Sequence, residues 1–169
     1  MSTQATQATR SRRRPRSTDS TFTPNESMGY LINVAGRLFS RALNARLLKH
    51  GVSIGQWPIL MFLFEKEGLS QQEISQHIGL EESTLARTIE RMERDGLVER
   101  LRSAIDRRRV ELTLTPRARA LRRSLRSCAI AVNETAMAGL SDNAMERLLQ
   151  GLAHMRARLE EDLGTPGDS

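Results

Sequence analysis

The chain has 169 residues, 38% of them hydrophobic, which allows one compact domain and is too short for two independent enzymatic domains. Its 26 Lys and Arg residues outnumber its 20 Asp and Glu residues, and the resulting formal net charge of +6 predicts a polyanionic partner. The single cysteine, Cys128, excludes an internal disulfide framework, and no apolar run approaches the roughly 18 residues of a membrane span, so we expect a soluble, cytoplasmic protein.

Residues 1–22 are predicted to form a disordered basic arm. Within residues 1–20, five arginines stand against one aspartate, which is a local charge of +4. This segment has no apolar run and therefore cannot be the hydrophobic region of a secretory signal. A start that is rich in Arg, Ser and Thr and poor in acidic residues also fits a mitochondrial transit peptide, which stays open as the alternative.

A long amphipathic helix is predicted over residues 24–49. Thr23 supplies a cap, Pro24 suits the first helical position, and Glu26 can reach back to the amide of the cap. Apolar residues then recur every three or four positions as far as Gly51, where the pattern ends.

Two shorter helices should follow. The first, over residues 53–67, is expected to begin at a serine cap, and Pro58 just past its first turn should produce a mild kink. Ser70 and Glu73 then have the spacing of a capping box, which predicts a short helix that ends at Gly79.

A helix over residues 82–94 follows almost at once, and two short helices joined by a tight turn with a glycine are typical of a helix-turn-helix. Its inward face is expected to consist of Leu85, Ile89 and Met92. Beyond it, residues 97–101 and 110–114 alternate apolar and polar side chains and enclose a basic segment. This pattern predicts a β-hairpin with a charged tip.

Two helices are predicted to complete the chain. Thr115 and Pro116 repeat the combination of cap and proline before a helix to about residue 138, and Ser141 can cap the last helix, to about residue 163. With the first helix, they carry more apolar surface than the central unit can cover, so we expect a second copy of the chain to cover it. The residues expected to need that partner surface are Leu121, Leu125, Ile130, Val132, Leu140, Met145, Leu148, Leu149, Leu152, Met155 and Leu159.

Candidate DNA-contacting residues lie on the second helix of the pair and on the hairpin. In a helix-turn-helix, the second helix enters the major groove with its N-terminal residues against the bases. Arg87 is the first choice, because its planar fork can grip a guanine or a phosphate at two points. In the hairpin, arginines can enter a narrow minor groove, and Asp106 is expected to hold a neighbouring arginine in place. The alternative is a merely solvated surface. The predicted contact residues are Ser83, Thr84, Arg87, Thr88, Arg91, Asp106, Arg107, Arg108 and Arg109.

These segments resemble the MarR family of regulators. The first helix of the pair, LSQQEI at residues 69–74, matches the family, as do STLAR at 83–87 and RMERDGLV at 91–98 in the second helix and its exit. The most specific element is DRR at 106–108, followed by LTLTP at 112–116. The resemblance spans about residues 24–163. It departs from the family where Ser103-Ala104 replaces a common Asp-Pro, which affects the turn of the wing, and where Ser75 replaces a common alanine.

The resemblance implies a mainly α fold with a small β wing, a winged helix-turn-helix with N- and C-terminal dimerisation helices. The implied homodimer is triangular and holds two winged domains over successive major grooves. The expected divisions are the arm at 1–22, a dimerisation helix at 24–50, the winged helix-turn-helix domain at 52–115, C-terminal dimerisation helices at 116–163 and a flexible tail at 164–169.

The resemblance also implies a small-molecule effector. Members of the family often bind phenolic compounds or aromatic carboxylates in a cleft between the dimer helices and the winged domain. The matching positions suggest Arg37 as a carboxylate partner and Trp57 as an aromatic wall, against the alternative of a surface cation and a core residue. Cys128 lies outside the first long helix, where the family's peroxide-sensing cysteine stands, and is expected to be a small buried apolar residue.

The predicted function is that of a sequence-specific transcriptional regulator of double-stranded DNA, by family default a repressor, that an aromatic or phenolic ligand releases from a pseudo-palindromic operator. No catalytic constellation or phosphate-binding glycine loop is visible, so we expect no enzyme and no cofactor. The three histidines, His50, His77 and His154, share no motif, and no metal site is predicted. The alternative is an architectural protein that binds DNA by charge alone and has no ligand.

Overall fold

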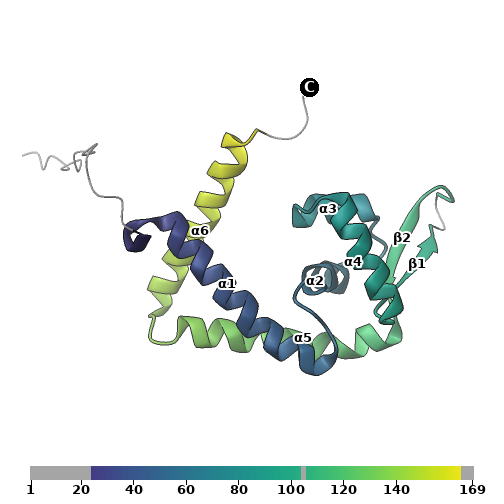
Figure 1. Cartoon of the computed structure of the whole chain (residues 1–169), viewed down its shortest axis with the longest axis horizontal. Coiled ribbons are helices and arrows are strands. Elements are labelled where there is room, and N and C mark those ends of the chain that lie inside the picture. The colour runs from purple at the N-terminus through teal and green to yellow at the C-terminus, as the bar shows by residue number, and fades with distance from the viewer. Residues whose placement is uncertain (1–23, 104–105, 165–169) are drawn as a thin grey trace, which may run out of the picture. The chain divides into compact units, whose positions relative to one another are not determined.

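The computed structural model describes residues 24–103 and 106–164, so the predicted arm and all but the first residue of the predicted tail lie outside the described residues. The chain divides into two compact units, Met1–Gly36 and Arg37–Ser169. The elements in chain order are η1 (Pro24–Glu26), α1 (Met28–Leu47), η2 (Leu48–His50), α2 (Trp57–Glu65), α3 (Gln71–Ile78), α4 (Glu82–Arg94), β1 (Val98–Arg102), β2 (Val110–Leu114), α5 (Pro116–Met137) and α6 (Asp142–Asp162) (Figure 1). The prediction of a mainly α fold with a small β wing is confirmed.

The core of the second unit lies between α2, α3, α4 and the two strands. The inward face predicted for α4 is confirmed, because Leu85, Ile89 and Met92 are fully buried. They pack in one cluster with apolar residues of the other elements, among them Leu47, Ile59, Leu60, Leu63, Ile74, Leu97, Leu112 and Leu125. Complete burial of one helix face fixes which face of α4 remains available to solvent.

The helix start signals act as predicted at three positions. The Ser70 hydroxyl accepts from the Glu73 backbone N–H at 3.2 Å while the Glu73 carboxylate accepts from the Ser70 N–H at 2.7 Å, which completes the capping box of α3. Thr115 caps α5 and Ser141 caps α6 through the same side-chain contact with the third helical residue. Gly79 ends α3 at φ 70°, a left-handed conformation that glycine adopts without strain.

Two predictions about α2 are wrong. This helix begins at Trp57, because residues 53–56 form a turn in which the Gln56 side chain accepts from the Ser53 N–H at 2.9 Å. Pro58 therefore lies inside the first turn, where no helical hydrogen bond needs its N–H, and the expected kink has no cause. Gln56 also donates to Asp95 at 2.7 Å and so ties the start of α2 to the end of α4.

The two strands form the predicted antiparallel hairpin, with Val98 opposite Leu114 and Arg102 opposite Val110. A third segment joins the other edge of β2, because the Gly68 N–H donates to Leu112 O at 3.0 Å and the Leu112 N–H donates to Leu69 O at 2.9 Å. The hairpin is therefore fixed to the loop between α2 and α3 along the base of β2.

The apolar surface of the C-terminal helices is covered differently from the prediction at two positions. Leu125 is fully buried and Val132 is 4% exposed within the single chain, so the expectation that they need a partner is wrong. Several others are exposed, and α6 contributes no residue to the core cluster among those the structure describes. The exposed members of the predicted set are Ile130, Leu140, Leu148, Leu149, Leu152 and Leu159.

Candidate nucleic-acid interface

Helix α4 is held in place by its buried face and by hydrogen bonds around the turn before it. The Ser75 hydroxyl donates to Leu80 O at 2.6 Å, and the Gln71 side chain donates to Glu82 O at 3.3 Å, so the start and the middle of α3 are bonded to the segment that opens α4. In Figure 1, α4 lies between α3 and the hairpin, which agrees with its contacts to both. The orientation of its exposed face is therefore fixed from two sides.

The predicted contact residues of α4 lie on the face opposite the core. Ser83, Thr84, Arg87 and Arg91 are exposed, whereas Thr88 is half-buried and its hydroxyl donates to Thr84 O at 3.0 Å. Arg87 forms no ion pair with any residue in the described part of the chain. The face thus presents hydroxyls and guanidinium groups, which can donate to base edges and phosphate oxygens.

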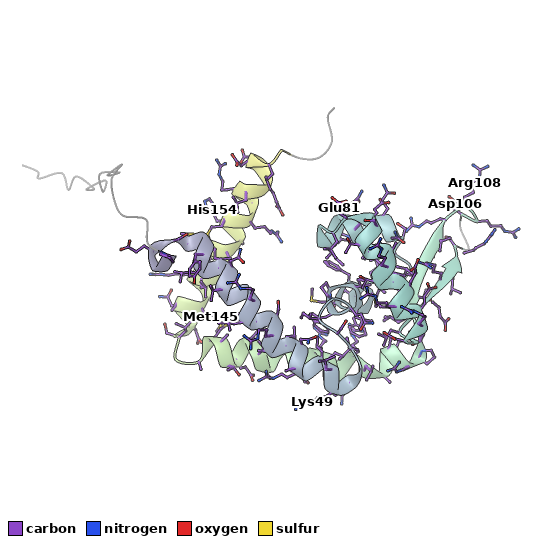
Figure 2. All side chains as sticks on the ribbon, viewed as in Figure 1. Lys49, Glu81, Asp106, Arg108, Met145 and His154 are labelled. Atoms are coloured by element: carbon purple, nitrogen blue, oxygen red, sulfur yellow. The ribbon has the colours of Figure 1, made fainter. Side chains whose placement is uncertain are left out.

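The tip of the hairpin exposes Asp106, Arg107 and Arg108, and Figure 2 shows Asp106 and Arg108 at the end of the wing. An Asp106 carboxylate oxygen accepts from the backbone N–H of Arg108 at 2.9 Å. The Arg109 N–H donates to Asp106 O, and the Ser103 N–H donates to Arg109 O, each at 2.9 Å. Asp106 therefore holds the backbone that carries Arg108 by an Asx-type turn rather than by an ion pair with its guanidinium.

Arg109 differs from its two neighbours, because its side chain is turned toward α3. Its Nη2 lies 2.5 Å from a Glu73 carboxylate oxygen and 3.2 Å from Gly68 O, and its Nε lies 3.5 Å from Glu111. Gly68 has φ 78°, which explains the glycine at this position. A run of three arginines gives no sequence signal that one of them points away from the other two.

Two carboxylates beside the hairpin are held in the charged form. Hydrogen bonds from the Ser70 backbone and hydroxyl, and then from Arg109, lower the pKa of Glu73 to about 2. The paired hydrogen bonds from Arg119, at 2.9 and 2.7 Å, lower the pKa of Glu67, which also accepts from the Leu114 N–H at 2.9 Å. Glu67 and Glu73 therefore stabilise the hairpin and its neighbours only while they are ionised.

We expect the stability of the winged unit to fall in acid. Because the pKa of Glu73 is lower in the folded chain than its ordinary value of 4.5, its contribution is complete above about pH 4.5 and is lost as the pH falls toward 2. Melting temperatures measured across this window should decline, and Glu73→Gln should flatten the decline. An equal decline in Glu73→Gln and wild type would contradict this role.

A cavity of about 320 Å³ lies between α2 and α5. Trp57 is 8% exposed and belongs to the core cluster, which agrees with the alternative of a core residue, and it also lines this cavity, whereas Arg37 is not one of the lining residues. Arg126 and Asn133 supply polar groups there, and the helical spacing of residues 126, 130 and 133 is the signal that could have placed them on one face of α5. The full lining is Trp57, Met61, Phe64, Glu65, Arg126, Ala129, Ile130 and Asn133.

The remaining candidate chemistry is sparse within the described residues. Cys128 is half-buried and packs against the core cluster. No three His, Cys, Asp or Glu side chains of residues 24–103 and 106–164 gather in a way that could hold a metal ion. None of the helices in these ranges has the length and apolar character needed to cross a membrane.

Two packed helices, an exposed polar face on the second and a basic hairpin beside it define a winged helix-turn-helix DNA-binding protein. The model of the MarR family matches residues 52–110. The HTH-type transcriptional regulator TtmR of Methylorubrum extorquens (strain PA1) is 32% identical over 136 residues, which are 80% of this chain and 69% of TtmR. The chain belongs to the MarR family and is a DNA-binding transcriptional regulator.

Solved structures agree in fold. A putative MarR family regulator from Listeria monocytogenes in complex with a 26mer DNA has a TM-score of 0.73 at 17% identity, over 85% of this chain and 99% of that one. CouR from Rhodococcus jostii RHA1, bound to p-coumaroyl-CoA, has a TM-score of 0.67 at 21% identity, over 87% of this chain and 99% of CouR. At these identities the likeness establishes the fold alone.

Proposed function

We propose that the protein is a homodimeric repressor of the bacterial cytoplasm that binds a pseudo-palindromic operator, with α4 of each copy in the major groove and the wing in the adjacent minor groove. The observation that carries this proposal is the division of α4 into a fully buried apolar face and an exposed face of hydroxyls and guanidinium groups. The exposed arginines at the tip of the wing extend the same basic surface. The Listeria relative was solved in complex with DNA, which supports this mode of use.

The proposed dimer is supported by apolar side chains that the single chain leaves in solvent. In α6, Leu148, Leu149 and Leu152 are 40% to 52% exposed and recur at three- and four-residue spacing with the half-exposed Met145 and Met155. In α1, the residues Met28, Tyr30, Leu31, Ile32, Leu38 and Phe39 are exposed as well. Contiguous apolar surface of this kind is typical of an interface.

The proposed effector is a small aromatic or phenolic carboxylate in the cavity between α2 and α5. Trp57, Met61 and Ile130 offer apolar contact to a ring, and Arg126 offers a charge-assisted hydrogen bond to a carboxylate. In this proposal Arg126 takes the role first expected of Arg37. CouR, which binds an aromatic CoA thioester, supports an aromatic ligand in this fold.

The decisive experiment selects bound duplexes from a random pool and measures the affinity of the preferred sequence and of a scrambled one at two salt concentrations. A regulator retains a preferred palindrome as the salt rises. A protein that loses affinity equally on both duplexes is the charge-driven architectural alternative, and that outcome would overturn the proposal. Aromatic acids that raise the melting temperature are then tested for operator release.

We expect Arg126→Gln to abolish operator release by any aromatic acid that passes this screen, because the variant removes the charge that would bind its carboxylate. The affinity for operator without ligand should stay unchanged. Arg37→Gln is the matched control and should retain release. If Arg37→Gln loses operator release and Arg126→Gln retains it, Arg37 and not Arg126 binds the carboxylate of the ligand.

A further inference from the structure

The side chain of Arg109 joins the hairpin to a segment 36 to 41 residues earlier in the chain, the loop before α3 and the first turn of α3. Its Nη2 bonds to Glu73 in the first turn of α3 at 2.5 Å and to Gly68 O in the loop before it at 3.2 Å, over separations of 36 and 41 residues. Its Nε lies at ion-pair distance, 3.5 Å, from Glu111 in β2. Among the described residues, this Nε is buried and lacks a hydrogen-bond partner. The guanidinium is thus surrounded by protein on the side of α3.

The backbone of the same residue closes the tip of the wing. Its N–H donates to Asp106 O and its O accepts from the Ser103 N–H, so the turn that carries Arg107 and Arg108 ends at Arg109. The other bonds between the hairpin and the α2–α3 loop are made by Leu112 and Leu114, nearer to the base. Arg100 in β1, opposite Leu112, forms an ion pair with Glu93 of α4 at 2.6 Å. Arg109 is therefore the contact to the helix-turn-helix that lies closest to the tip.

We propose that Arg109 is a positioning residue, which together with Glu73 fixes the wing relative to the recognition helix and so selects the DNA step that Arg107 and Arg108 reach. Both partners keep more than a third of their side chains in solvent, at 39% and 36% exposure, so the pair adds little to stability. Its consequence is orientation, because without this pair the hairpin is held only as far as Arg100 and Leu112, in the middle of its strands, and its tip can swing. The inference rests on the proposed function, in which the wing enters the minor groove.

The test uses the full chain and duplexes that share both half-sites and differ only in the flanking steps, A·T-rich or G·C-rich. Wild type should prefer the A·T-rich flank, whose minor groove is narrow and attracts arginine. In Arg109→Met and in Glu73→Gln, the ratio of the affinities for the A·T-rich and the G·C-rich duplex should fall close to 1. The double variant should lose no more of this preference than either single variant. Simple electrostatics predicts instead that Glu73→Gln tightens binding to every duplex, because it removes a negative charge.

Two features keep the experiment interpretable. Glutamine also serves in a capping box, so Glu73→Gln retains the start of α3, and all variants are compared below their melting temperatures. Arg109→Lys retains the charge but lacks the fork that bridges Glu73 and Gly68, so it should lose the flank preference like Arg109→Met.

Additive effects in the double variant, or a fall of about one in the salt slope per subunit for Arg109→Met alone, would show a direct phosphate contact and overturn the positioning role. A flank preference that survives in Glu73→Gln and Arg109→Met would overturn it too, while groove readout by the wing would stand. A wild type without any flank preference would instead contradict the proposed function, and the positioning role with it.

Discussion

Leu152→Glu should convert the protein to a monomer and lower its affinity for a two-half-site operator by about 10²- to 10⁴-fold. Leu152 lies in the middle of the exposed apolar stripe of α6, where a buried carboxylate without a partner would oppose association. A dimer binds the second half-site as an intramolecular event, and a monomer loses that advantage although its winged domain is unchanged. Analytical ultracentrifugation and anisotropy titrations on one- and two-half-site duplexes measure both effects.

The matched control is His154→Glu, which places the same charge on the opposite side of α6 by helical spacing and at an exposed position. This variant should remain dimeric and bind the operator as wild type does. A Leu152→Glu protein that sediments as a dimer would show that the stripe is covered by something other than a second copy.

Arg87→Ala should lower specific binding by about 1–3 kcal/mol at each half-site, because it removes a bidentate contact from the part of α4 that enters the major groove. Each copy of a dimer carries the substitution, so the operator affinity should fall at least about 30-fold. Non-specific binding should change far less, and the ratio of specific to non-specific affinity should fall with it. Anisotropy titrations on cognate and scrambled duplexes give this ratio.

Arg94→Ala is the control that matches the loss of charge. Arg94 is exposed at the other end of α4, in its last turn, so its removal should weaken binding to cognate and scrambled duplexes alike. Arg108→Ala should also weaken binding, because Arg108 lies at the tip of the wing. It should change the preference for the central bases of each half-site less than Arg87→Ala does. An unchanged specificity ratio for Arg87→Ala would exclude base readout by this residue.

Local sequence signals determined the hairpin, the exposed face of α4 and the helices, apart from the start of α2, which the turn at residues 53–56 delays to Trp57. The capping box at Ser70, the proline after Thr115 and the apolar spacing of Leu85, Ile89 and Met92 each act within one or two turns of chain, so no knowledge of the rest of the fold is needed to interpret them. The same signals identified the family, because the motifs that carry the resemblance are contiguous.

Only the tertiary structure decided which partner each of the similar side chains finds. Arg109 bonds to Glu73 and Gly68 across 36 and 41 residues, Leu125 is buried within its own chain, and Arg126 rather than Arg37 lines the cavity beside Trp57. Neighbouring arginines have the same local propensity and the same charge. Successive leucines of one stripe have the same hydrophobicity. What separates them is the position of elements that are distant in sequence, and this is fixed by packing of the whole core.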